Sequence, residues 1–258
     1  MGDKSKIATA LGNIGIIYHK QGDYPTALDH YRQALEIDKE LGNKNGIARH
    51  LGNIGNIYSD QGDYPTALDH YRQAMEIHKE LGDKNKIAAG FGNIGIIYQN
   101  QGDYPTALDH YWQALEMAKE LDYKVFQAIM LGNIGTIYHE LGDYPTALDH
   151  YRQALEIDEE LGNKDHIATW LGNIGITISA LAEQEKHSRK KDSLYAAAMK
   201  HYKESIKISK EIGYKLIMAN SRIAMAGLFI KQHKPLLALP LTNTAIALLT
   251  EMHYLYHL

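Results

Sequence analysis

Apolar residues recur along the chain at spacings of three and four, and the whole pattern repeats every 40 residues. In the first unit, Leu11 and Ile14 belong to one such stretch and Tyr31 belongs to a second. This spacing places the apolar side chains on one face of an α-helix. The pattern predicts one helix over residues 5–20 and another over 24–41, with equivalents in the later units.

A short polar segment separates the two predicted helices. Gly22 favours the left-handed turn that ends a helix, Asp23 is a suitable N-cap for the next one, and Pro25 is tolerated only in a first turn. The block that contains them, GDYPTALDHY, occurs four times, at residues 22–31, 62–71, 102–111 and 142–151. A fixed repeat of this length is the signature of a stacked helical array. We therefore predict an all-α solenoid of helix-turn-helix units.

Successive units can be aligned along nearly the whole chain, and we expect them to form a single array. Their predicted bounds are 5–41, 45–81, 85–121, 124–161, 165–211 and 214–252. The fifth unit has a charged insertion, 182–193, which moves its second helix to 194–211. The sixth is a degenerate closing unit, and Pro240 is expected to kink its second helix.

Seven residues of the first unit have a spacing that is specific for one family. They are Leu11, Ile14, Gly15, Tyr18, Ala27, Tyr31 and Ala34. In this respect the unit resembles the tetratricopeptide repeat, although Leu11 replaces the family's Trp, Lys39 replaces its Pro, and the period exceeds the usual length of about 34 residues. Units of this kind are similar to those of Partner of Inscuteable proteins, kinesin light chains and bacterial signalling proteins. The resemblance implies a right-handed superhelix with a concave face that binds peptides.

Two glycines in the first helix, Gly12 and Gly15, need a steric explanation, because each costs a helix about 1 kcal/mol relative to Ala. They do not form a phosphate-binding loop, since they lie within a helix rather than between a strand and a helix. We expect close packing against the neighbouring helix at Gly15.

One stripe of the first helix faces away from its packed side, and the resemblance identifies this stripe with the concave groove. Asn recurs at the second position of the stripe, as Asn13, Asn53, Asn93, Asn133 and Asn173. The other groove residues that we predict are Ile16, Lys20, Arg49, Asn56, Asp60, Ile96, Asn100, Thr136 and Glu140.

A carboxamide can pair with both the N–H and the C=O group of an extended peptide, whatever the peptide's side chains are. Recurrent Asn residues would then act as sequence-tolerant rungs, spaced about 10 Å apart along a bound segment. Two alternatives stay open: the Asn residues survive from recent duplication, or they bond within the array.

The remaining stripe positions differ between units, whereas the exposed positions of the second helix barely differ. This contrast favours groove positions tuned to a ligand, although patchy recombination among copies would give the same pattern. Arg49 alone does not make the cationic clamp that some family members use for a chaperone's terminal carboxylate. Ile16 and Ile96 favour an internal segment with apolar side chains.

Composition excludes several functional classes. The formal charge of −4 gives no general attraction for nucleic acid, so nucleic-acid binding is not expected. The chain has no cysteine, and therefore neither a disulfide nor a thiolate metal site. No secretory signal or uninterrupted apolar membrane span is recognised, and we expect a cytoplasmic protein that needs no cofactor.

The second helices carry residues that could be mistaken for chemical sites. A recurrent His, at positions 30, 70, 110 and 150, is too widely spaced for a shared metal ion, and we expect these side chains on a solvated convex face with Arg32 and Glu36 as an ion pair. No acid and base pair or nucleophile motif is evident, so we predict no enzymatic activity. The basic run 186–191 is interpreted as a solvated insertion, with a contact to an acidic partner or nucleic acid as the alternative.

The end of the array lacks the polar outer face that a closing helix needs. Apolar residues spread around the last predicted helix and continue through Met252, Tyr254, Leu255, Tyr256 and Leu258. Such a patch indicates an interface, so we expect self-association through a terminus unless the last residues fold back.

The function predicted from the sequence is a scaffold that binds a protein or peptide segment in a preformed groove. The alternative from a different class is the sensor or oligomerisation region of a larger signalling ATPase or regulator.

Overall fold

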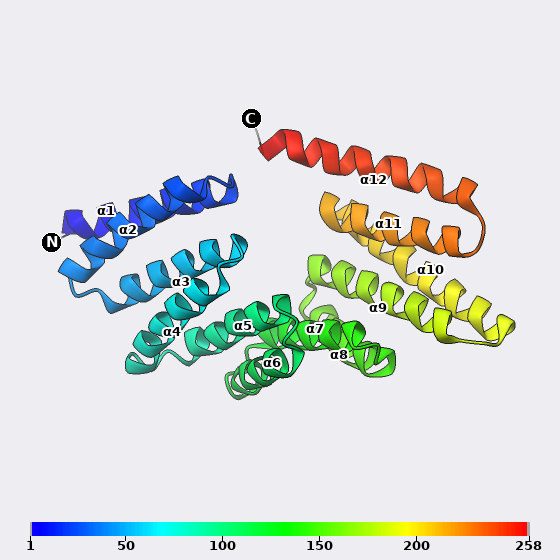
Figure 1. Ribbon diagram of the computed structural model, residues 1–258, viewed down its shortest axis with the longest axis horizontal. Coiled ribbons are helices and arrows are strands. Elements are labelled where there is room, and N and C mark those ends of the chain that lie inside the picture. The colour runs from blue at the N-terminus through cyan, green and yellow to red at the C-terminus, as the bar shows by residue number, and fades with distance from the viewer. Residues whose placement is uncertain (1, 257–258) are drawn as a thin grey trace. The chain divides into compact units, whose positions relative to one another are not determined.

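The computed structural model describes residues 2–256, and the side chains of residues 3–252. All the regular structure in this part of the chain is α-helical, which confirms the predicted class. The helices are consecutive pairs joined by short turns (Figure 1). The chain divides into two compact units, Met1–Asp122 and Tyr123–Leu258. The predicted single array is not tested by this division and stays a prediction.

The first unit contains three helix pairs. Their bounds are α1 Gly2–Lys20, α2 Tyr24–Glu40, α3 Lys44–Asp60, α4 Tyr64–Glu80, α5 Lys84–Asn100 and α6 Tyr104–Glu120. Each helix packs against the next in chain order. The predicted helix ends agree with these bounds to within a few residues.

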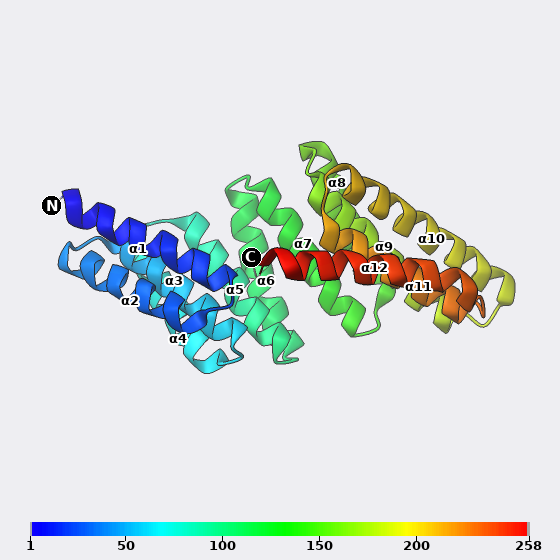
Figure 2. The same cartoon turned by 90° about the horizontal axis from the view of Figure 1, so that it is seen from above.

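The second unit also contains three helix pairs. Their bounds are α7 Lys124–Glu140, α8 Tyr144–Leu161, α9 Lys164–Gln184, α10 Ser188–Glu211, α11 Lys215–Lys231 and α12 Pro235–Tyr256. Consecutive helices pack together, and α9 also contacts both α7 and α11. Figure 2 shows α12 running along α11, and the helix continues through Pro240.

The turns form as their residues predict. Gly22 has a φ of +78°, the left-handed conformation that a side chain would disfavour. The Asp23 carboxylate accepts a hydrogen bond from the Thr26 backbone N–H at 3.2 Å, and Pro25 lies in the first turn of α2. This arrangement satisfies one of the backbone donors that a helix N-terminus leaves open.

Within each of the first five pairs, a glycine of the first helix meets a tyrosine of the second. A Cβ atom added at Gly15 would lie 2.7 Å from Cε1 of Tyr31, and one added at Gly95 would lie 2.6 Å from Cε1 of Tyr111. These tyrosines are almost completely buried. The expected close approach of the two helices at Gly15 is therefore confirmed, and the tyrosine ring explains why a side chain is excluded.

The insertion in the fifth repeat is mostly helical, so its predicted second helix at 194–211 was too short. Helix α9 continues to Gln184 and α10 already begins at Ser188. Local carboxylates pair with the basic run, since Lys190 lies 2.7 Å from Glu185. The prediction erred because the charged residues were interpreted as a loop, whereas lysine, arginine and glutamate are good helix formers.

The recurrent histidines are not on a solvated face as predicted. His30 and His110 are half-buried, and their rings stack on Tyr18 and Tyr98 of the preceding helix at centroid distances of 5.6 and 5.5 Å. An aromatic ring gains more from this packing than from full hydration. These histidines therefore help to join the two helices of a repeat.

The predicted ion pair between Arg32 and Glu36 is also wrong. Arg32 instead donates from Nη2 to the Tyr58 hydroxyl at 3.0 Å, and Glu36 faces Lys39 at 3.9 Å. Arg32 thus links neighbouring repeats, which is a contact that no pattern within one helix predicts.

Helix α12 exposes several large apolar side chains. Leu236 is 84% exposed and Leu239 is 59% exposed, whereas Ala238 and Ala245 are buried. Residues Pro235–Met252 are long and apolar enough to cross a membrane by length and composition alone, although polar residues interrupt the apolar run. Beyond Met252, the side chains of the predicted patch lie outside the described residues. Self-association stays a prediction, for which light scattering at high micromolar concentration is the test.

Candidate functional site

The first helices of the three repeats in the first unit border a series of hollows. One is a cavity of about 430 Å³ between α3 and α5, with α4 as its floor. Two smaller hollows of about 280 Å³ adjoin it: one shares Thr9 with it, and the other shares Asn56, Tyr71 and Asn93. Together they form a groove along α1, α3 and α5.

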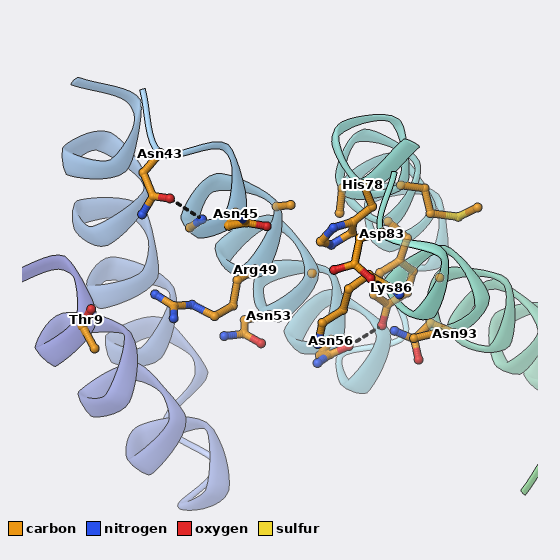
Figure 3. A pocket seen from close by; sticks show the side chains of 18 residues that line it. Thr9, Asn43, Asn45, Arg49, Asn53, Asn56, His78, Asp83, Lys86 and Asn93 are labelled. Carbon is orange, nitrogen blue, oxygen red and sulfur yellow. Dashed lines mark hydrogen bonds between the residues drawn. The ribbon is translucent and has the colours of Figure 1, made fainter. Parts of the chain in front are cut away.

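The groove collects several of the predicted site residues. Figure 3 shows Arg49, Asn53 and Asn56 along α3, with Asn93 on α5. The smaller hollows add Asn13 on α1, and Asp60 and Ile96 beside Asn56. Residues that were selected by their spacing in the sequence therefore lie on one surface, which three helices form.

The five recurrent Asn residues differ in exposure but share one property. Asn13 is exposed, while Asn53, Asn93, Asn133 and Asn173 are half-buried. Within the described part of the chain, none of their carboxamides forms a hydrogen bond. The alternative that they bond within the array is not supported, and the amide groups are available to a ligand.

Two further predicted groove residues have partners within their own repeat. Asn56 accepts a hydrogen bond from the Tyr71 hydroxyl at 2.7 Å, and Thr136 accepts one from the Tyr151 hydroxyl at 3.0 Å. Burial is the main cause that raises the pKa of Tyr71, to about 12, so this hydroxyl stays protonated and donates. Asn56 and Thr136 thus position a buried tyrosine, and the Thr136 hydroxyl also donates to the Gly132 carbonyl oxygen at 3.0 Å.

Asp60 is also engaged, because its Oδ2 lies 2.7 Å from Nε2 of His19 on the preceding repeat. The equivalent positions, Lys20, Asn100 and Glu140, are exposed at the last residue of their helices. At the position of Asn56, the equivalents Ile16 and Ile96 are 39% and 40% exposed. The groove of the first unit is therefore mixed in character, with polar amides and isolated apolar side chains.

Three residues that shape the main cavity were not predicted from the sequence: Gly52, Gly90 and His78. A Cβ atom at Gly52 would have no neighbour within 4 Å, so the space in front of it is empty. The signal was present at the position that directly precedes Leu11 and its equivalents Leu51, Phe91, Leu131 and Leu171. It is Ala10, His50, Gly90, Met130 and Trp170 in successive repeats.

In the second unit the corresponding space is filled. The Trp170 ring lies against Gly132, where an added Cβ atom would collide with it. The indole Nε1 donates to Oδ2 of the buried Asp158 at 2.7 Å. Asn133 and Asn173 therefore lie beside a closed surface, in contrast to Asn53 and Asn93.

The described residues contain no group of three or more His, Asp or Glu side chains that could hold a metal ion. The chemistry that the groove offers is hydrogen bonding by amides, apolar contact and the positive charge of Arg49 and Lys86, both of which are exposed. These are properties of a binding surface.

Comparison with known proteins identifies the repeat. The family model described as Tetratricopeptide repeat matches residues 6–80, 46–120, 86–160 and 126–186. No curated protein sequence gives a match to the chain.

Several solved structures share the fold. The apo form of RapI has a TM-score of 0.71 at 18% identity, over 96% of this chain and 85% of that chain. BtubC from P. vanneervenii has a TM-score of 0.67 at 15% identity, over 92% of each chain. A Rap protein complexed with Competence and Sporulation Factor has a TM-score of 0.69 at 19% identity, over 95% of this chain and 69% of that chain. At these identities the likeness shows the fold alone.

Proposed function

Because this chain belongs to the tetratricopeptide repeat family, we propose that it is a protein-interaction scaffold whose groove binds an extended segment of a partner protein. The observation that carries the proposal is the set of unpaired carboxamides along the first helices. In the first unit these are Asn13, Asn53 and Asn93, which lie at the hollows of one groove. An extended chain offers alternating N–H and C=O groups that such amides can pair with.

The composition of the groove favours an internal segment over a free C-terminus. Exposed Ile96 supplies apolar contact, and the two cations of the main cavity, Arg49 and Lys86, are accompanied there by the carboxylate of Asp83. Because the helices are stiffened by packing against their neighbours, the groove is formed before the partner arrives. A complex of a Rap protein with Competence and Sporulation Factor indicates that this fold can carry a binding site for another molecule. No observation on the described residues separately favours the sensor or oligomerisation alternative.

The test is selection from a phage-displayed library of random 12-residue peptides, followed by titration of the selected peptides. The double variant Asn53→Ala, Asn93→Ala should weaken their binding about fivefold or more, because each lost hydrogen bond is worth about 0.5–1.5 kcal/mol. The matched control is Gln73→Ala, Gln113→Ala, which removes two carboxamides from exposed positions of α4 and α6.

The control should keep the affinity of the parent protein. If no peptide is selected, or if both double variants bind the selected peptides as the parent does, the proposed groove is wrong.

A further inference from the structure

The cavity between α3 and α5 exists because one side chain is missing from the repeat pattern. At the equivalent position of the preceding repeat, the His50 ring lies against α1, where a Cβ atom at Gly12 would approach its Cε1 to 2.7 Å. Trp170 occupies the same place against Gly132 in the second unit. In the third repeat the position is Gly90, and the space in front of Gly52 is left open.

In two repeats the second helix of the pair supplies a polar partner for that side chain. The buried Asp38 lies 3.1 Å from Nε2 of His50, and the buried Asp158 accepts the Trp170 indole N–H. Beside the open cavity, His78 is the equivalent of Asp38 and Asp158. The equivalent of His50 and Trp170 is Gly90, which has no side chain to contact His78.

His78 is left with an unmet hydrogen-bonding capacity. Its Nδ1 atom is buried and has no partner among the described residues, as is also true of Nδ1 of His50 and His110. Such an atom costs free energy in a packed protein unless a ligand or water satisfies it. Burial is the main cause that lowers the pKa of this imidazole, which favours a neutral ring with one nitrogen free to accept. Figure 3 shows His78 at the cavity, on the same side as Asp83 and Lys86.

From this geometry we propose that the cavity between α3 and α5 is a specificity pocket for one tryptophan or tyrosine side chain of the bound segment. The ring lies in the open space in front of Gly52, which corresponds to the space that His50 fills against Gly12 and that Trp170 fills against Gly132. Its N–H or O–H group donates to Nδ1 of His78. The proposal rests on the groove binding described above, and names the side chain that the groove selects.

The size and lining of the cavity suit this occupant. A cavity of about 150 Å³ is enough for benzene in a protein interior, so about 430 Å³ admits an indole with part of its backbone. Tyr71, Ala74 and Met75 provide the surface of α4 for contact with the ring. Asn53 and Asn93 lie on either side, where they can pair with the backbone that carries it.

The pocket is tested with N-acetyl-L-tryptophanamide as the probe and with the full chain. Two-dimensional ¹H–¹⁵N NMR spectra should show saturable shifts of the Gly52 and Gly90 amides. Gly52→Leu places a side chain in the open space without an existing neighbour, and should abolish these shifts. Gly90 is unsuitable for this purpose, because an added side chain there would collide with Met75.

The matched control is Gly227→Leu in α11, another helical glycine with nothing within 4 Å of an added Cβ atom. It should bind the probe as the parent does. Gly52→Ala, which fills less of the space and favours the helix, should weaken binding without loss of fold, as circular dichroism can establish.

The role of His78 is tested with a second probe, N-acetyl-1-methyltryptophanamide, which lacks the indole N–H. The parent should prefer the first probe by about two- to tenfold, the range expected for one hydrogen bond. In His78→Leu this preference should disappear. An unchanged preference would overturn the assigned hydrogen bond.

The pocket itself is overturned if the Gly52 and Gly90 amides do not shift in the parent, or if the Gly90 amide still shifts in Gly52→Leu. If the peptides selected from the library bind Gly52→Leu as tightly as they bind the parent, the pocket proposal is wrong and the groove proposal is retained. Probe binding that Gly52→Leu abolishes, together with a library that yields no peptide, would support the pocket and reject the proposed function.

Discussion

At the scale of single residues, the repeat depends on glycines that exclude a side chain. Gly55, Gly95 and their equivalents in the first five repeats lie against a tyrosine ring of the second helix, so their recurrence has a steric cause. The environment of the glycines three residues earlier differs between repeats. Gly12 and Gly132 are covered by a ring from the next first helix, whereas Gly52 is open.

Gly95→Leu should therefore destabilise the protein. The new side chain would have to displace the buried Tyr111 ring, and overpacking of this kind costs about 1–3 kcal/mol. Chemical denaturation followed by circular dichroism measures the change. Gly52→Leu is the control, since it meets no atom and should cost less. Equal stability of the parent and Gly95→Leu would contradict the assigned contact.

At the scale of helices, turn chemistry defines where each element begins and ends. Asp143 accepts from the Thr146 backbone N–H at 3.2 Å and from its hydroxyl at 2.7 Å, at the start of α8. Tyr123 at the start of α7 makes no such bond with its side chain. The two turns show that this fold tolerates an uncapped helix.

Asp143→Ala should lower the free energy of unfolding by about 1 kcal/mol, because it leaves backbone donors of α8 without their acceptor. Asp143→Asn is the matched control, since an amide oxygen also caps a helix and should preserve most of the stability. Thermal unfolding followed by circular dichroism distinguishes the two. A midpoint for Asp143→Ala equal to that of Asp143→Asn would show that the cap contributes nothing.

At the scale of the whole molecule, buried histidines couple stability to pH. Burial is the main cause that lowers the pKa of His50, His78, His110, His139, His150 and His201. The folded chain holds these rings neutral at a pH where the unfolded chain, with a pKa of about 6.5, already binds protons. Their contribution to stability is therefore present above about pH 6.5 and is lost as the pH falls through the lowered pKa values.

The free energy of unfolding in urea should accordingly fall between pH 7.5 and pH 5.5. His110→Phe keeps an aromatic ring against Tyr98 but removes one proton-binding site, so its stability should fall less over this interval. Comparing the variant with the parent at both pH values isolates this one group from the other titrating residues. Parallel pH dependences would show that His110 does not contribute.

The sequence by itself determined the all-α class, the helix pairs, their turns and the helix face that holds the recurrent Asn residues. These features are local, because helical period, N-caps and left-handed glycines act within a few residues, and repetition strengthens each signal. The sequence could not determine that charged residues 182–193 would extend two helices, because helix propensity and solubility favour opposite interpretations of the same residues.

Only the tertiary structure decided which groups are left free. Asn56 and Asp60 carry the same kind of polar side chain as Asn53, yet they pair with Tyr71 and His19, while Asn53 keeps its amide available. The cavity is open because Gly90 has no side chain that could cover Gly52. The two glycines are 38 residues apart in the sequence and come to face the same space only when the repeats stack. Hydrogen bonding and packing between repeats are decided by distance in space, and a pattern within one repeat carries no information about that distance.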